Sequence, residues 1–125
     1  MQYQFAIAWR WDLSSTTQPY KPNIYNENSA DAPTFNIWEF PNNGGDSWAY
    51  SDAQMIQRFN DNYNGKALSS KKMMNYISHP HWFNVDKPKL ENLFSYINEN
   101  TNRDDKGPVI YVTLDQAYKI WELNK

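Results

Sequence analysis

The sequence predicts an α/β fold in which parallel strands alternate with helices, and three observations point to it. Large apolar residues alternate strictly with small or polar ones from Gln2 to Asp12, which is the pattern of a strand. Two segments that begin at Ser51 and Thr113 carry a capping-box pattern ahead of apolar residues at helical spacing. In the second half of the chain, strand-like and helix-like segments follow one another in turn, as they do in parallel βαβ units.

The composition favours one domain spanning residues 1–125, with 40% hydrophobic and 17% aromatic residues. Twelve basic and fourteen acidic side chains give a net charge of −2, without a long block of one sign, so nucleic acid is not an expected partner. No apolar stretch approaches the ~20 residues that cross a bilayer, and the first residues lack the pattern of a signal peptide. The absence of cysteine excludes disulfides and thiolate metal sites.

The first strand is predicted to end in a charged pair. Arg10 and Asp12 lie on the same face of the segment and close to its C-terminal end, where they could form a site carboxylate oriented by an arginine. A structural ion pair is the alternative. Residues Leu13 to Pro33 are rich in Ser, Thr, Pro and Asn without periodicity, which predicts a long loop. The opposite face of the strand is apolar and carries Tyr3, Phe5, Ile7, Trp9 and Trp11.

A second strand is expected from Thr34 to Phe40, stopped by Pro41 and the turn-forming Asn42-Asn43-Gly44-Gly45. Glu39 would then lie at the C-terminal edge of this strand, as a candidate site carboxylate. An exposed or capped glutamate is the alternative.

The remaining elements alternate between helix and strand. After Ser51, apolar residues at helical spacing run to Tyr63 and predict a helix that ends at Asn64-Gly65. A short strand follows from Lys72 to Ser78. The next helix is expected to have Pro88 in its first turn and to run to about Asn100. The last two elements are a strand from Val109 to Val112 and a helix capped by Thr113-Leu114-Asp115-Gln116.

Ligands gather at the C-terminal ends of parallel strands, and here those ends carry Arg10, Asp12, Glu39 and His79. His79 and His81 are the chain's two histidines. They share one face of an extended segment around Pro80, so both could reach one substrate, or one metal completed by carboxylates such as Asp12, Glu39 or Asp86. An acid/base role, a metal site and ordinary loop histidines all stay open.

An aromatic wall is a further possibility, because the faces of sugar rings stack on indole and phenol rings. Packing in the core is an equally good explanation of these aromatic residues. The sequence has no Gly-rich phosphate loop, no serine nucleophile elbow and no zinc-protease helix motif, which disfavours nucleotide hydrolysis and serine-hydrolase chemistry. The candidate substrate-binding residues are Trp38, Glu39, Trp48, Tyr50, His81 and Trp82.

From Thr34 onward the sequence resembles the C-terminal half of a polysaccharide deacetylase of the carbohydrate esterase family 4 type. The similarity is carried by the strand TFNIWEFP and by NYISHPHWF, which is similar to that family's last histidine motif. It continues through the helix KPKLENLFSYINEN and the ending PVIYVTLDQAYKIW. The earlier FAIAWRWDLS is a weaker match to a strand that ends in Trp and Asp.

The resemblance implies half of a distorted (β/α) barrel that, when complete, removes N- or O-acetyl groups from a polysaccharide. His79 would be the general acid, with Asp12 and Arg10 as further catalytic candidates. The family uses a zinc-like divalent metal, held by a His-x-x-x-His motif that is absent here, so no metal is expected in this chain alone. The motif and the catalytic base belong to the family's N-terminal half, so the isolated chain is expected to be inactive.

The expected partners are therefore a glycan and either the missing N-terminal half or a second copy of the chain. The resemblance also implies an extracellular or cell-surface location. Two other functions compete with the enzyme portion: a non-catalytic carbohydrate-binding or assembly module, and a structural domain whose aromatic residues are buried and bind no ligand.

Overall fold

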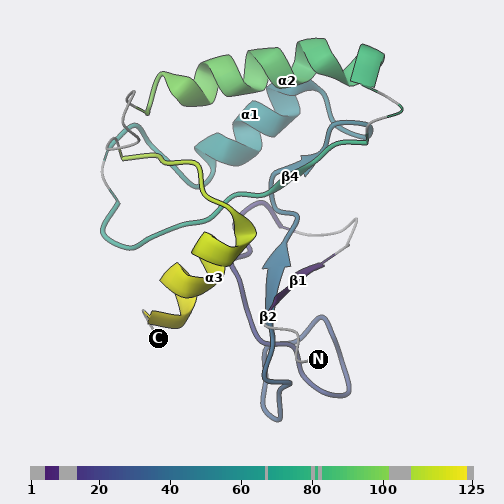
Figure 1. Ribbon diagram of the computed structural model, residues 1–125, viewed down its shortest axis with the longest axis vertical. Coiled ribbons are helices and arrows are strands. Elements are labelled where there is room, and N and C mark those ends of the chain that lie inside the picture. The colour runs from purple at the N-terminus through teal and green to yellow at the C-terminus, as the bar shows by residue number, and fades with distance from the viewer. Residues whose placement is uncertain are drawn as a thin grey trace.

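The computed structural model describes residues 5–8, 14–66, 68–79, 81, 83–101 and 108–123, and these form a mixed α/β structure. Within these ranges the chain has three helices and two pairs of short strands (Figure 1). No helix among them is long and apolar enough to cross a membrane. The elements are β1 (Phe5–Ala8), β2 (Trp38–Pro41), β3 (Gly45–Asp46), α1 (Asp52–Asn60), β4 (Tyr76–Ile77), α2 (Phe83–Asn98) and α3 (Leu114–Leu123).

Both strand pairs are parallel, and α1 separates β3 from β4, whereas the described residues between β1 and β2 form the long loop. β1 pairs with β2 over four residues, from Phe5 opposite Trp38 to Ala8 opposite Pro41. β3 pairs with β4, with Asp46 opposite Ile77. Two short, separate pairs are less than the continuous sheet of a half barrel, so the barrel stays a prediction.

The apolar core lies between α1 and α2, which run side by side above β4 in Figure 1. Met55 and Phe59 on α1 and Leu93 and Ile97 on α2 are buried, and Tyr63 joins them from the chain after α1. Burial of one such side chain contributes roughly 1.5–3 kcal/mol, so this cluster is the main source of stability among the described residues.

The predicted capping box of α1 is present. The Ser51 hydroxyl accepts a hydrogen bond from Gln54 N, and the Gln54 side chain accepts one from Ser51 N. The helix ends at Asn60, earlier than the predicted Asn64-Gly65. The reason is a tight turn that follows, in which Asn62 N donates to Phe59 O and the Asn62 side chain donates to Ser15 O.

The second strand is shorter than predicted and contains Pro41 instead of stopping before it. Proline lacks an N–H, but it is tolerated here as the last residue of the strand. Thr34 pairs with Asn23 across the long loop, outside the strand. Glu39 is the second of the four residues of β2, where its backbone exchanges hydrogen bonds with Tyr20 at 2.7 and 3.1 Å.

Helix α2 begins five residues before Pro88, so the prediction of Pro88 in the first turn is also wrong. The carbonyl that loses its usual N–H partner belongs to Asn84, and Asn84 and Pro88 are both exposed, which keeps the cost of an internal proline low. The strand predicted from Lys72 to Ser78 is reduced to β4. Residues before it pair with side chains instead, since Met73 N donates to Gln18 Oε1 and Asn75 N donates to Asn43 Oδ1.

The predicted strand from Val109 to Val112 is not formed. This segment and residues 70–76 both line a cavity of about 690 Å³, and Val109 packs against the core cluster. Helix α3 follows with its predicted capping box, in which Thr113 Oγ1 accepts from Gln116 N and Gln116 Oε1 accepts from Thr113 N. Figure 1 shows α3 apart from α1 and α2.

The long loop predicted from Leu13 to Pro33 is confirmed over its described part, residues 14–33, which contain no helix or strand. Asn23 organises its outer end. The Asn23 Oδ1 atom accepts from Tyr25 N and Asn26 N, its Nδ2 donates to Asp31 O, and its backbone N donates to Ser29 O. The loop is therefore closed on itself at Asn23.

Candidate functional site

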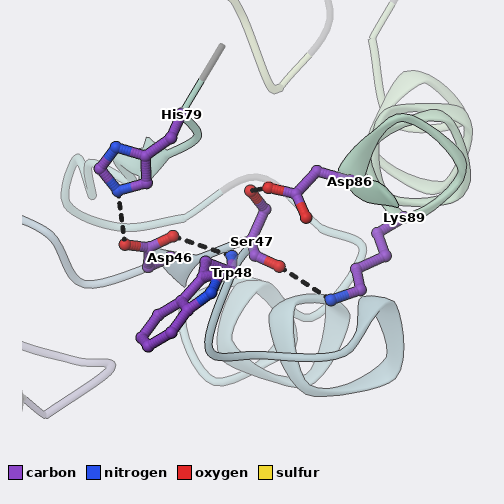
Figure 2. Close-up of polar contacts among 6 residues, drawn as sticks. All are labelled: Asp46, Ser47, Trp48, His79, Asp86 and Lys89. Carbon is purple, nitrogen blue, oxygen red and sulfur yellow. Dashed lines mark hydrogen bonds and ion pairs between the residues drawn. The ribbon is translucent and has the colours of Figure 1, made fainter. Parts of the chain in front are cut away.

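Asp46 and His79 meet where β3 and β4 end. The His79 Nε2 atom lies 3.1 Å from Asp46 Oδ2 (Figure 2). Asp46 is the last residue of β3, and His79 follows β4 by two residues, so the parallel register of Asp46 with Ile77 brings the two side chains to one edge. The structure places His79 at this edge, with Asp46 as a partner that the sequence did not indicate.

Two glycines let β3 approach β4 closely. A Cβ atom on Gly44 would lie 2.5 Å from ring atoms of Tyr76, and Gly45 has a φ of 102°, which L side chains rarely adopt. The turn then closes on Asp46. Its Oδ1 accepts from Trp48 N at 2.8 Å, and its backbone carbonyl accepts from Ala49 N and Tyr50 N. The Asp46 carboxylate is thus fixed at both oxygens before any ligand arrives.

The pair is buried on one side and accessible on the other. The Asp46 side chain is 3% exposed, whereas the His79 side chain is 36% exposed. A carboxylate oxygen accepts hydrogen bonds, so the Nε2–H tautomer of His79 is the one that can donate to Asp46. A buried carboxylate that holds an accessible imidazole is an arrangement used for proton transfer in acid/base catalysis.

A second polar group lies directly behind the pair. Ser47, which is fully buried, donates its hydroxyl proton to Asp86 Oδ2 at 2.5 Å. The Ser47 carbonyl accepts from Lys89 Nζ at 2.9 Å, and its backbone N donates to Ile77 O at 2.9 Å. Figure 2 shows Ser47 between Asp46 on one side and the helix residues Asp86 and Lys89 on the other.

His81 lies near His79, with ring centroids 6.0 Å apart. No group of three or more His, Asp or Glu side chains that could hold a metal occurs in the part of the chain that the structure describes. The described residues therefore do not fit a divalent metal on their own, and no step of the chemistry below is routed through one.

The predicted aromatic wall is divided among different places. Trp48 is 56% exposed and adjoins the Asp46–His79 pair (Figure 2). Trp38 lies on β2, where its indole N–H donates to Glu122 Oε2 at 2.6 Å and Lys21 Nζ lies 5.2 Å from its ring centroid. Tyr50 packs against the core cluster with Arg58 over its ring. Of these three, only Trp48 can present an exposed ring to a ligand beside the pair.

Three predicted site residues, Arg10, Asp12 and Trp82, lie outside the described residues. Glu39 belongs to the β1–β2 pair and not to the β3–β4 pair that carries the site. None of the described site candidates lines the 690 Å³ cavity, which is bordered by residues 108–114 and α3.

Asp46 is the site residue that the sequence patterns missed, and Asp86, considered from the sequence only as a carboxylate that could complete a metal site, was not expected to contact Ser47. Asp46 follows Asn42-Asn43-Gly44-Gly45, a run that indicates a turn and hides the short strand within it. Asp86 looks like an ordinary acidic residue in the first turn of a helix. What distinguishes these two carboxylates is that they are buried, and burial is seen only in the three-dimensional structure.

No family model, no curated protein and no solved structure matches this chain.

Proposed function

We propose that this chain is a portion of a carbohydrate deacetylase, which hydrolyses acetyl groups from a glycan when it is complete. The observation that supports the proposal best is the Asp46–His79 pair, at 3.1 Å, at the C-terminal ends of two parallel strands. The segment that contains His79 is the one that resembles the deacetylase histidine motif. The two lines of support, geometry and resemblance, are independent of each other.

In this proposal His79 is the general acid. Asp46 holds the Nε2 side of the ring, so the proton that is given up comes from Nδ1 of the imidazolium. It passes to the amine or alkoxide that leaves when the acetyl carbon–nitrogen or carbon–oxygen bond breaks. Asp46 keeps the ring oriented through its contact with Nε2. Proton transfer of this kind typically contributes 10²–10⁴-fold to a rate.

Trp48 supplies the sugar contact. Its backbone N–H is fixed by Asp46 Oδ1, and its ring is more than half exposed, so the turn that orients the carboxylate also orients the indole. A sugar ring stacked on Trp48 would lie beside His79. The substrate class that this arrangement favours is a glycan with an acetylated substituent next to the stacked ring.

The rest of the active site is assigned to a partner segment. The divalent metal and the base would come from an N-terminal half, or from a second chain, that docks on the strand edges left open here. A glycan substrate of this kind is consistent with the extracellular or cell-surface location that the resemblance implies.

Two measurements on the natural protein test the proposal. Its intact mass should exceed the 14.8 kDa of this chain, and it should release acetate from tetra-N-acetylchitotetraose or from acetylated xylo-oligosaccharide. The His79→Ala variant should lose about 10²–10⁴-fold of that release. Lys87→Met, at an exposed lysine of α2 paired with Glu91, is the matched control and should keep full activity. Acetate release that survives His79→Ala contradicts the proposal.

A carbohydrate-binding module without catalysis is the second candidate, favoured by the exposed Trp48 ring. If this second function is right, the chain alone should bind tetra-N-acetylchitotetraose. The Trp48→Ala variant should lose this binding, and the His79→Ala variant should retain it. The enzyme proposal expects His79→Ala to remove acetate release while binding persists. A natural protein of 14.8 kDa that binds the sugar and releases no acetate would favour this second function.

A further inference from the structure

We propose that Asp86 and Lys89 are positioning residues, which fasten helix α2 to the turn that carries Asp46 and Trp48 and so fix the orientation of His79 and of the indole together. The inference rests on the proposed function for the role of the pair. The contacts that carry it involve neither the substrate nor the rest of the enzyme.

Ser47 is held in place on three sides. Its three polar groups are held by three different partners: the backbone N by Ile77 of β4, the hydroxyl by Asp86, and the carbonyl by Lys89. Ser47 lies between Asp46 and Trp48 in the chain. A residue fixed at three points leaves its two neighbours little freedom, so the direction of the Asp46 carboxylate follows from the attachment of Ser47.

The second step is the burial of Asp86. It is 1% exposed, although it is a carboxylate in the first turn of a helix, a position where acidic residues are usually solvated. A buried carboxylate is costly unless it is hydrogen-bonded, and the Ser47 hydroxyl supplies a short bond at 2.5 Å. The contact therefore defines one position of α2 relative to the turn, because any displacement would leave the carboxylate unsatisfied.

The third step is the reach of Lys89. Its Nζ atom donates to Ser47 O at 2.9 Å and to Tyr50 O at 3.3 Å, which spans the two ends of the turn. Asp86 and Lys89 are three residues apart and so lie on the same face of α2. Lys87, between them in sequence, points elsewhere, with its side chain 58% exposed and paired with Glu91. Helix α2 thus has one lysine, Lys89, that contacts the turn, and a neighbouring lysine, Lys87, that serves as the matched control.

The two halves of the site come from segments that are far apart in the sequence. The segment with His79 leads directly into α2, while Asp46 and Trp48 come from the turn between β3 and α1. The two halves of the site therefore arrive from different parts of the chain. Asp86 and Lys89 attach the end of α2 nearest His79 to the turn that holds Asp46, which sets the distance between the two halves.

The experiment compares four single variants of the chain as it stands: Asp86→Asn, Asp86→Ala, Lys89→Met and Lys87→Met. The readouts are the His79 ring resonances in long-range ¹H–¹⁵N spectra, which report the Nε2–H tautomer bonded to Asp46, and the indole ¹H–¹⁵N resonance of Trp48, which a Trp48→Phe variant assigns. Far-ultraviolet circular dichroism checks that each variant keeps its helices. These signals do not depend on acetate release, so they can fail or succeed separately from the proposed function.

Lys89→Met should shift the His79 resonances and lower the Nε2–H population, while Lys87→Met leaves both unchanged. Asp86→Asn keeps an oxygen that accepts from Ser47, so it should retain the wild-type signals that Asp86→Ala loses. If Asp86→Ala does not fold, Lys89→Met and Asp86→Asn still decide the matter. In the complete enzyme, Lys89→Met should reduce acetate release on the order of 100-fold, the usual effect of a small misplacement.

Folded Lys89→Met and Asp86→Ala proteins with unchanged His79 signals would overturn the inference. An equal change in Lys87→Met would also overturn it, because the effect would then belong to the charge of the helix and not to the contact with Ser47. Loss of stability without any change at His79 would assign the two residues to folding alone.

Discussion

Helices α1 and α3 begin in the same way and pack differently. Each has a complete capping box, from Ser51 to Gln54 in one and from Thr113 to Gln116 in the other. Helix α1 buries Met55 and Phe59 against α2, whereas Ala117 is the buried residue of α3. A cap depends on four neighbouring residues, but burial depends on a second surface, which α1 finds in α2. Helix α3 and residues 108–113 line a cavity whose other walls include Phe59 of α1 and Ile97 of α2.

The largest expected effect comes from truncating an apolar side chain in the α1–α2 core, compared with truncating one near α3. Leu93→Ala empties a fully buried position in α2 and should cost about 2–5 kcal/mol of unfolding free energy. Ile110→Ala changes a side chain that is 48% exposed and should stay within about 0.5 kcal/mol. Urea titration followed by circular dichroism measures both. Equal losses would mean that residues 108–113 are covered in solution.

Tyr76 offers a test at alkaline pH. Burial raises the pKa of Tyr76 above its ordinary value, and its hydroxyl donates to Met55 O at 3.2 Å, so the folded state keeps the phenol neutral. Because the folded pKa is raised, this stabilisation is complete below the unfolded pKa, near 10. It is lost as the pH rises through the interval between the unfolded and the folded pKa, at about 1.4 kcal/mol per pH unit.

The measurement is the unfolding free energy of wild type and Tyr76→Phe between pH 9 and pH 11, a range set by the ordinary pKa of tyrosine. The wild type should lose stability more steeply than Tyr76→Phe. If the unfolding free energies of the two proteins fall in parallel with pH, water reaches Tyr76 between α1 and β4. The packing of this region would then be as loose as that around α3.

The capping boxes of α1 and α3 make the same hydrogen bonds, but their loss should affect the global unfolding free energy to different extents. Ser51→Ala should lower the global unfolding free energy by about 1 kcal/mol, because α1 is part of the cooperative core. Thr113→Ala should mainly accelerate amide hydrogen exchange within α3 and change the global value less. Hydrogen exchange and urea unfolding of both variants check this. A global loss from Thr113→Ala as large as that from Ser51→Ala would place α3 in the same cooperative unit.

The smallest effect is expected at the surface of the α1–α2 contact. The pKa of Asp52 is lowered chiefly by the hydrogen bond from Asn92 and further by Ala53 N. A lowered folded pKa stabilises the fold above the unfolded pKa, and this contribution is lost as the pH falls through the folded value. Asn92→Ala should raise the pKa of Asp52 toward 3.8, as measured by ¹³C carboxyl titration. An unchanged pKa would show that Asn92 does not contact Asp52 in solution.

Much of the local structure could be predicted from the sequence. Both capping boxes and the long loop followed from neighbouring residues, and the strand predicted from Lys72 to Ser78 placed His79 just beyond a strand. The Asp46–His79 pair could not be predicted, because 33 positions separate the two residues and only the register of Asp46 with Ile77 brings them together. The strand predicted at Val109–Val112 is not formed, although its residue pattern is that of a strand.

The self-closed end of the long loop has an evolutionary consequence. Because Asn23 braces residues 24–31 through four hydrogen bonds and Thr34 closes the base, the tip is separated from β2 and from the site. Exposed tips of this kind accept insertions and deletions with little thermodynamic cost, since closure entropy grows slowly with loop length. Homologues could therefore vary in length between Tyr25 and Ala30, and an affinity tag or reporter domain could be inserted there, while the distance between Asp46 and His79 stays the same.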